Sequence, residues 1–384
     1  MHHGHCRFED HLTQQARVLT GQCGRIVACS AEELSAAFTQ IESARLAGHW
    51  VALLLDYELG EWLEPALAAT ARLPVSDAIT AQPRLTALVF KHMHEARPWS
   101  AEAECPGEIK STIVSVMPKI AKEIYLARIQ QIREWIAQGE VYQINATFPL
   151  HVQTEGDSAQ FYRQIASHHP VAHAAYIEDE NRTILSFSPE LFLQRTGNTL
   201  ITRPMKGTAP RSTEPDTDRR LGEALQASEK NRAENLMIVD LLRNDLGRIA
   251  RPGTVRAEPL FSLEKYPSVW TMTSTVTAEI ASNTSLDKIL RALFPCGSVT
   301  GAPKIAAMKR IQETEPDPRG MYCGSLGWLA PNGDFSLNVA IRTLVLDDKG
   351  TGRYDVGGGI VYDSEPEQEW QECHWKARIL NTCL

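Results

Sequence analysis

The chain has 384 residues, of which 43% are hydrophobic and 22% charged, and it carries a formal net charge of -8 at pH 7. This composition is typical of a globular protein with a sizeable core, and the acidic balance without a basic stripe argues against a nucleic-acid partner. The longest apolar run, residues 51–55, is too short to cross a bilayer. Eight scattered cysteines without a Cys-x-x-Cys pair, and a start without an apolar signal segment, favour reduced thiols in the cytoplasm.

The first hundred residues combine weak helical and strand patterns. Residues 31–47 are expected to form a helix and residues 50–57 a strand. Residues 98–107 contain turn residues with little periodicity. We therefore expect an N-terminal part, residues 1–105, followed by a catalytic region, residues 106–384.

Stronger patterns follow this boundary. Residues 119–138 show a helical apolar stripe, and residues 141–152 alternate as a strand with one polar face. The stripe consists of Tyr125, Ile129, Ile132 and Ile136, and the polar face of Gln143, Asn145 and Thr147.

The rest of the chain alternates short strands with helices. Helical patterns return over residues 216–249, and another helix ends the chain. Turn residues separate short apolar runs, which favours antiparallel pairing and an α+β fold. Strands are expected at residues 174–177, 183–188, 191–195, 199–203, 324–329, 334–345 and 354–360.

The last helix carries candidate ligands. Ser364 and Glu367 have the spacing of a capping box. Glu369 and Glu372 lie three residues apart on one helical face, and Lys376 follows one turn later. Such a set can hold a hard cation and an anionic substrate, but spacing alone more often indicates a solvated face with a Glu372–Lys376 pair.

Two strand ends carry further candidates. Lys206 lies in a loop rich in proline and glycine, where a lysine is usually exposed and becomes a nucleophile only when its pKa is lowered. Glu190 ends another strand and is a candidate general acid or base.

Two glycine-containing segments can approach a ligand closely. Thr300 and Gly301 precede Pro303 at the start of a helix, where backbone amides can receive a carboxylate, although a plain strand-to-helix turn explains them equally well. Residues 357–359 are three successive glycines in an expected strand, which suggests close approach of a ligand to the backbone.

In this order, the motifs resemble those of the chorismate-utilising family, which includes anthranilate, aminodeoxychorismate, isochorismate and salicylate synthases. The resemblance implies a fold of two large, mostly antiparallel β-sheets packed together, with helices outside and the site between the sheets. It is strong from residue 115 onward. It rests on residues 139–145 (GEVYQIN), 188–190 (SPE), 233–245 (AENLMIVDLLRND), 300–304 (TGAPK), 341–343 (IRT) and 363–372.

The resemblance also implies a set of ligands and site residues. The cofactor would be Mg²⁺, held by Glu234, Glu369 and Glu372, and the substrate would be the dianion chorismate. The implied catalytic residues are Lys206 and Glu190. The implied substrate-binding residues are Tyr322, Arg342, Thr300, Gly301, Gly358, Gly359, Lys376 and Gln143.

Two positions distinguish members of this family. Isochorismate and salicylate synthases resemble one another in a lysine that activates water, where this chain has Gln143, an amide that cannot act as that base. Anthranilate synthases usually carry alanine where this chain has Lys206, whereas residues 205–208 (MKGT) resemble the aminodeoxychorismate synthase motif. The implied reaction converts chorismate and ammonia to 4-amino-4-deoxychorismate through a covalent Lys206 intermediate, towards 4-aminobenzoate and folate.

Two alternatives stay open: an anthranilate synthase component I, and a catalytically silent homologue that only binds a partner. Family members usually receive ammonia from a glutamine amidotransferase subunit, and no such region is recognised in this sequence, so a separate partner is expected. Thr271, Asn231 and Trp328 depart from the residues usual at their positions, and no tryptophan-binding motif is found.

Overall fold

The computed structural model describes residues 5–68, 70–71, 83–101, 111–266 and 269–383. Within these residues, seventeen strands are hydrogen-bonded into one large sheet and three more form a small sheet. The small sheet contains β11 (Met205–Pro210), β13 (Ser262–Lys265) and β14 (Val269–Thr273). The predicted α+β fold with extensive antiparallel sheet and outer helices is confirmed.

The large sheet draws strands from the whole length of the chain. They are β1 (Cys6–Asp10), β2 (Gln15–Ala28), β3 (Trp50–Leu55), β4 (Leu85–Ala96), β5 (Thr112–Pro118), β6 (Gln143–Glu155), β7 (His173–Asp179), β8 (Arg182–Ser188), β9 (Leu191–Thr196), β10 (Thr199–Arg203), β12 (Arg256–Ala257), β15 (Val276–Glu279), β16 (Gly301–Ala302), β17 (Ser325–Leu329), β18 (Phe335–Asn338), β19 (Thr343–Asp347) and β20 (Thr351–Ile360).

The helices cover the outside of these strands. They are α1 (Leu34–Leu46), α2 (Leu59–Leu63), α3 (Pro65–Ala68), α4 (Lys122–Ala137), α5 (Ser158–His168), α6 (Pro215–Ala227), α7 (Glu229–Gly247), α8 (Leu286–Leu293), α9 (Lys304–Thr314) and α10 (Pro366–Ala377), with 3₁₀ turns η2 (Gly297–Val299) and η3 (Arg378–Cys383). No helix within the described ranges is long and apolar enough to cross a membrane.

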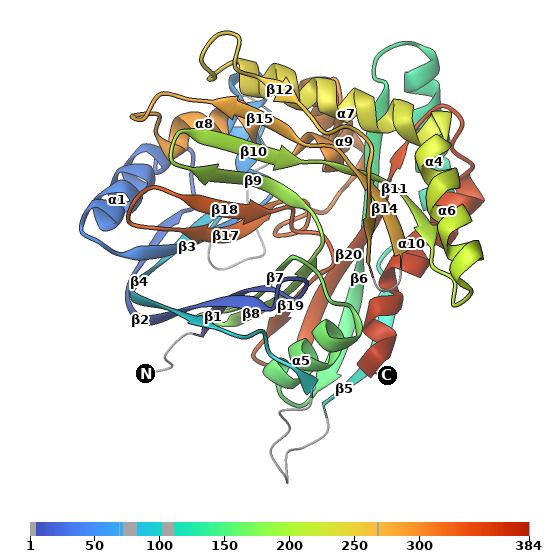
Figure 1. Ribbon diagram of the computed structural model, residues 1–384. Helices are drawn as coiled ribbons and strands as arrows, with labels where there is room; N and C mark the ends of the chain where they lie inside the picture. Colours follow the sequence, from blue (N-terminus) through green and yellow to red (C-terminus); the bar gives the residue numbers. More distant parts are fainter. Residues whose placement is uncertain (1–4, 69, 72–82, 102–110, 267–268, 384) are drawn as a thin grey trace.

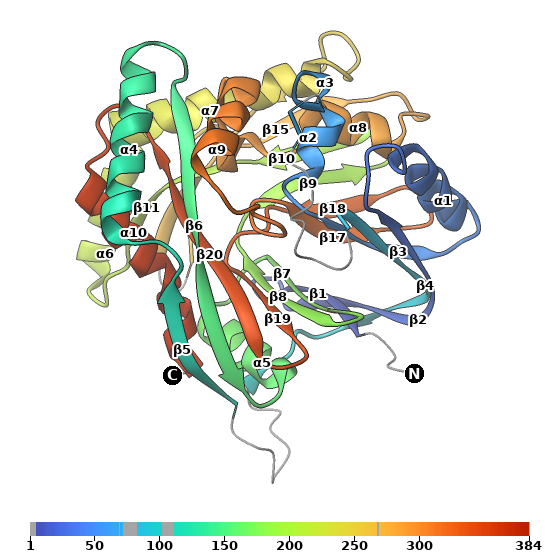
Figure 2. The ribbon, with the colours of Figure 1, turned by 180° about the vertical axis from the view of Figure 1, so that it is seen from behind.

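The large sheet folds over on itself, so that two layers of strands face each other. Figure 1 shows β9, β10, β17 and β18 above β1, β2, β7 and β8, with the long strands β6 and β20 running beside both layers. Figure 2, from behind, shows α4 and α9 against β6 and β20. β20 pairs with β6 along ten residues and with β19 on its other edge. It is therefore a central strand of the sheet, held on both sides by hydrogen bonds.

The N-terminal strands belong to the same sheet as the C-terminal ones. β1 pairs with β7, and β3 pairs with β17. The predicted boundary between residues 105 and 106 lies outside the described residues and stays a prediction.

Most predicted elements are confirmed within a few residues, with α1, α4 and β6 as examples. The helical region predicted over residues 216–249 divides at Ser228, whose hydroxyl accepts a hydrogen bond from the Asn231 backbone N–H at 3.3 Å and so caps α7. The single strand predicted over residues 334–345 is wrong. The chain leaves β18 after Asn338 and enters β19 at Thr343, because β18 pairs with β9 whereas β19 pairs with β8. Between the two strands, Arg342 has a left-handed backbone with φ of 51°.

The predicted capping box at the last helix is also wrong. Helix α10 begins with Pro366 in its first turn, so Glu365 takes the cap position without a side-chain hydrogen bond. Ser364 lies one residue earlier, where its hydroxyl accepts a hydrogen bond from the Val361 backbone N–H at 3.1 Å.

Candidate active site

A cavity of about 420 Å³ lies between β6, β11, β20, α7 and α10. Most residues predicted for the site line it. They are Lys206, Glu190, Tyr322, Arg342, Gly358, Gly359, Lys376, Glu234, Glu369 and Glu372. Glu190 and Lys376, which are 186 positions apart in the sequence, therefore line the same cavity.

Three carboxylates gather on the helical side of this cavity. Burial raises the pKa of Glu234 and of Glu369, because neither charged form is fully compensated. The nearby Lys376 ammonium, 2.7 Å away, holds the pKa of Glu372 below its ordinary value. Among the described residues no three His, Cys, Asp or Glu side chains are already arranged as metal ligands. Glu234 and Glu369 nevertheless lack full charge compensation and lie in the same cavity as Glu372, and three such carboxylates are a donor set that suits a hard cation.

A row of glycines on β20 forms the opposite side of the cavity. Lys376 Nζ donates to the Gly357 carbonyl at 2.7 Å. A Cβ atom at Gly358 would lie 2.9 Å from Glu369 Oε2, and one at Gly359 would lie 2.8 Å from Gln143 Nε2 and 3.0 Å from Lys206 Nζ. Side chains of the site thus reach the β20 backbone directly, which explains the glycine run.

Glu190 and Lys206 bring an acid and an amine into the same space. The Glu190 side chain is buried and accepts from the Met205 backbone N–H at 3.5 Å. Burial raises its pKa to about 7, against the opposing effects of a Ser298 hydrogen bond and the Lys206 charge. Burial lowers the pKa of the Lys206 amine, against the attraction of Glu234 and Glu190. Near neutral pH, the Glu190 carboxyl is therefore partly protonated, beside an amine that deprotonates more easily than usual.

Ser298 was missed by the sequence reasoning, although it lies two residues before Thr300. Its hydroxyl lies 3.2 Å from Cys296 Sγ and opposes the rise in the pKa of the Glu190 carboxyl. Only the pairing of distant segments reveals this proximity to Glu190.

Arg342 provides a positive end to the cavity. Its left-handed backbone lies between β18 and β19, and within the described part of the chain no carboxylate pairs with its guanidinium. The Tyr322 side chain beside the same cavity is buried, with 7% exposure. A half-buried guanidinium without an internal anion favours a carboxylate ligand.

Three predicted residues lie just behind the cavity lining. Gln143 is fully buried, and within the described residues neither of its carboxamide atoms has a hydrogen-bond partner. The Thr300 backbone N–H donates to the Gly297 carbonyl at 3.3 Å, inside the chain. A Cβ atom at Gly301 would lie 2.1 Å from the Gln143 carbonyl oxygen, so this glycine permits β16 to pack on β6.

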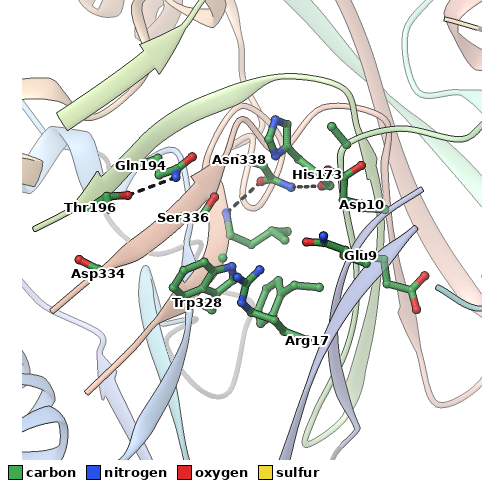
Figure 3. A pocket seen from close by; sticks show the side chains of 16 residues that line it. Glu9, Asp10, Arg17, His173, Gln194, Thr196, Trp328, Asp334, Ser336 and Asn338 are labelled. Carbon is green, nitrogen blue, oxygen red and sulfur yellow. Dashed lines mark hydrogen bonds between the residues drawn. The ribbon is translucent and has the colours of Figure 1, made fainter. Parts of the chain in front are cut away.

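A second cavity, of about 370 Å³, is separate from the first and contains none of the predicted site residues. Figure 3 shows it between β1, β2 and the β17–β18 hairpin, with Arg17 next to Trp328. The Arg17 guanidinium carbon lies 4.5 Å from the centre of the Trp328 ring. Trp328 therefore lies away from the site. Thr271, by contrast, donates to the Gly207 carbonyl at 3.2 Å, next to Lys206.

The fold and the cavity define an enzyme class in which an acid, an amine, a guanidinium and clustered carboxylates line one cavity. The chain belongs to the family of chorismate binding enzymes, whose sequence profile matches residues 5–382. This match confirms the resemblance inferred from the motifs.

Two curated relatives illustrate the range of activities in the family. Aminodeoxychorismate synthase component 1 of Salmonella typhimurium is 38% identical over 303 residues, which cover 78% of this chain and 66% of the relative. Anthranilate synthase component 1 of Streptomyces coelicolor is 39% identical over 261 residues, which cover 68% of this chain and 51% of the relative. The chain thus spans less than two thirds of the length of each.

Solved structures share the fold. Anthranilate synthase component I of Streptococcus pneumoniae superposes with a TM-score of 0.76 at 26% identity, over 87% of this chain and 80% of that one. A Bacillus anthracis protein described as an isochorismate synthase superposes with a TM-score of 0.77 at 23% identity, over 99% and 96% of the two chains. At 23% identity, the similarity to the Bacillus anthracis protein supports only a shared fold.

Proposed function

We propose that the protein is the chorismate-aminating large subunit of an aminodeoxychorismate synthase, which makes 4-amino-4-deoxychorismate from chorismate and ammonia. The observation that carries the proposal is the placement of Lys206 and Glu190 in one cavity, with Arg342 at its positive end. The overall identities to the two relatives are nearly equal, so the residues of the site decide between the two activities.

Lys206 acts as the nucleophile. Its amine attacks C2 of chorismate, both ring double bonds shift, and the C4 hydroxyl departs. The lowered pKa of Lys206 supports this role because only the neutral amine carries a lone pair. Ammonia then attacks C4, both double bonds shift back, and the Lys206 amine leaves C2. The two displacements place the new amino group at C4.

Glu190 moves the protons in both steps. With its pKa raised to about 7, its protonated form can give a proton to the departing C4 hydroxyl. The resulting carboxylate then takes a proton from the ammonia that has bonded to C4. The Ser298 hydroxyl beside Glu190 favours the charged form of that carboxyl and so limits the rise of its pKa.

The remaining residues bind and orient the substrate. Arg342 and Tyr322 would receive one substrate carboxylate. Glu234, Glu369 and Glu372 would hold Mg²⁺, which supplies positive charge for the other carboxylate when bound. The buried Gln143 carboxamide cannot deprotonate water, which disfavours hydroxylation of the ring. Ammonia would come from a glutamine amidotransferase subunit or from solution.

Product analysis tests the proposal. The purified chain is incubated with chorismate, Mg²⁺ and ammonium at mildly alkaline pH, and the mixture is separated by chromatography with mass detection. We expect 4-amino-4-deoxychorismate, which an added lyase converts to 4-aminobenzoate. Anthranilate as the product would assign the chain to the alternative activity. Absence of both products, even with a glutaminase subunit added, would favour a silent homologue.

Replacing Gly359 with alanine is expected to reduce chorismate turnover roughly a hundredfold, since the methyl group would displace Lys206 Nζ and Gln143 Nε2, and small misplacements of reacting groups are costly. Stability should change by less than about 1 kcal/mol, because both neighbours are ends of flexible side chains. Kinetics and thermal melts measure both effects.

Gly247→Ala is the matched control for this variant. Gly247 ends α7, and an added Cβ would meet nothing within 4 Å, so activity should stay at the original level. If Gly359→Ala turned over chorismate as fast as the control, the placement of Lys206 against β20 would be refuted.

A further inference from the structure

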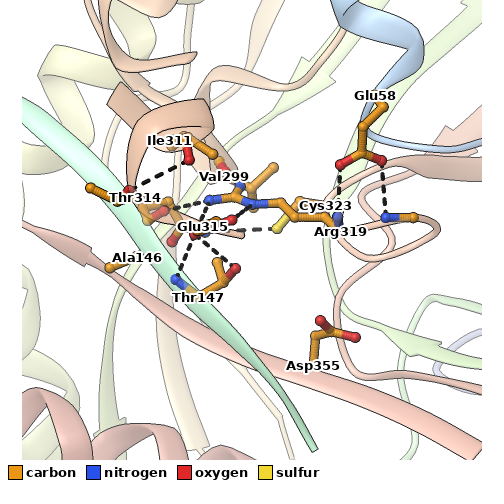
Figure 4. Close-up of polar contacts among 12 residues, drawn as sticks. Glu58, Ala146, Thr147, Val299, Ile311, Thr314, Glu315, Arg319, Cys323 and Asp355 are labelled. Carbon is orange, nitrogen blue, oxygen red and sulfur yellow. Dashed lines mark hydrogen bonds and ion pairs between the residues drawn. The ribbon is translucent and has the colours of Figure 1, made fainter. Parts of the chain in front are cut away.

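A buried arginine, Arg319, lies behind the active-site cavity and contacts the backbone that forms it. Its residue exposure is 2%. Its Nε and Nη2 donate to the two carboxylate oxygens of Glu315 at 2.7 and 2.9 Å. Its Nη1 donates to the Val299 carbonyl at 2.9 Å, and Nη2 also donates to the Asn145 carbonyl at 2.6 Å. Figure 4 shows the guanidinium in the middle of this group.

The two carbonyls belong to segments that shape the site. Val299 and Asn145 both line the cavity. Val299 follows Ser298, which lines the cavity together with Glu190, and Asn145 lies two residues after Gln143 on β6. The planar guanidinium therefore bridges the η2 turn and β6, next to the direct hydrogen bond from the Asn145 backbone N–H to the Thr300 carbonyl at 2.8 Å.

Further hydrogen bonds hold the arginine itself. Glu58 accepts from the backbone N–H groups of Arg319 and Gly320 at 2.6 and 3.0 Å. Thr147 donates to Glu315 Oε1 through both its backbone N–H and its hydroxyl, each at 3.0 Å. The Arg319 guanidinium carbon also lies 4.5 Å from the centre of the Tyr57 ring. The pair is thus fixed from the N-terminal segment, from β6 and from the end of α9.

We propose that Arg319, paired with Glu315, is a positioning residue of the active site, which holds the Ser298–Val299 backbone against β6 so that Glu190 and the substrate meet their partners. The kinetic part of this proposal rests on the proposed function. A lysine could keep the charge opposite Glu315, but its single ammonium cannot reach both carbonyls and the carboxylate in the planar arrangement of a guanidinium.

Arg319→Lys tests the proposal, with Arg7→Lys as the matched control. Arg7 is another buried arginine, which pairs with Glu9 at 2.8 Å and lies outside the lining of the cavity. We expect Arg319→Lys to raise KM for chorismate at least tenfold with a smaller fall in kcat, and to speed hydrogen exchange of backbone amides in residues 297–303 and 143–147. Arg7→Lys should change neither KM nor exchange in these segments.

Both readouts separate positioning from general stability. A lowered melting temperature with unchanged KM and unchanged exchange in these segments would overturn the proposal. If Arg319→Lys does not fold, Thr147→Ala decides, since it removes one hydrogen bond to Glu315 and should raise KM and exchange in the same direction, whereas no change would overturn the proposal. A wild-type chain without chorismate turnover would contradict the proposed function, while the exchange result would still decide the role of Arg319.

Discussion

Replacing Lys206 with alanine is expected to reduce formation of 4-amino-4-deoxychorismate by at least about a thousandfold, as expected for loss of a covalent nucleophile. Chorismate should still bind, because Arg342 and Tyr322 remain. Without the Lys206 amine at C2, ammonia can attack that carbon directly as the C4 hydroxyl departs, and loss of the C3 side chain as pyruvate then gives anthranilate, which we expect among the residual products. Product chromatography with mass detection measures both amounts.

Lys265→Ala is the control for this variant. Lys265 lies on β13 of the small sheet, outside the cavity lining, with its ammonium 5.6 Å from the centre of the Trp270 ring. Its replacement should leave the product and its rate unchanged. Full activity of Lys206→Ala would rule out the covalent mechanism and leave direct amination as the remaining route.

Removal of divalent metal is expected to abolish turnover, with a loss of at least about a hundredfold, since a bound cation contributes several kcal/mol of charge stabilisation. Added Mg²⁺ should restore the rate. The physical reason is the group of Glu234, Glu369 and Glu372, in which burial raises the pKa of the first two and leaves their charged forms in need of a cation. Activity after chelation with EDTA and after adding Mg²⁺ gives the result.

A pair of variants on α10 separates the metal site from general charge effects. Glu369→Gln should weaken the rise in melting temperature that Mg²⁺ produces in the absence of substrate. Glu367→Gln, on the same helix, should not, because that side chain is 56% exposed and pairs with Lys122 at 2.8 Å. Equal behaviour of both variants, or full activity in EDTA, would remove the predicted magnesium site.

The local pattern of the sequence was sufficient for most elements of the fold. Apolar spacing in α4 and alternation in β6 are properties of neighbouring residues, so they are readable before any tertiary structure is known. The polar row of β6 was also recognised, but its burial was not. Gln143, Asn145 and Thr147 are all buried, because β6 is covered by the paired strand β20, by the residues around the cavity and by the Arg319–Glu315 pair.

Breaks within elements were less readable. Nothing in the alternation around residues 334–345 indicates that Arg342 takes a left-handed backbone, since that conformation is imposed by the paths of β18 and β19 into different neighbours. The same break orients Arg342 towards the cavity. Pro366 and Ser364 gave conflicting signals for the start of α10, and the proline prevailed because its fixed φ suits the first helical turn.

By itself, the sequence determined the fold class, the family and the chemical types available to the site, because these depend on periodicity and on motifs contained within short segments. Only the tertiary structure decided which of those residues share a cavity, and it placed Thr300 and Gly301 behind the lining while adding Ser298 to the surroundings of Glu190. It also revealed the Arg319–Glu315 pair, whose two acceptor carbonyls are 20 and 174 residues away along the chain. Contacts at such separations depend on strand register and close packing, which no local pattern encodes.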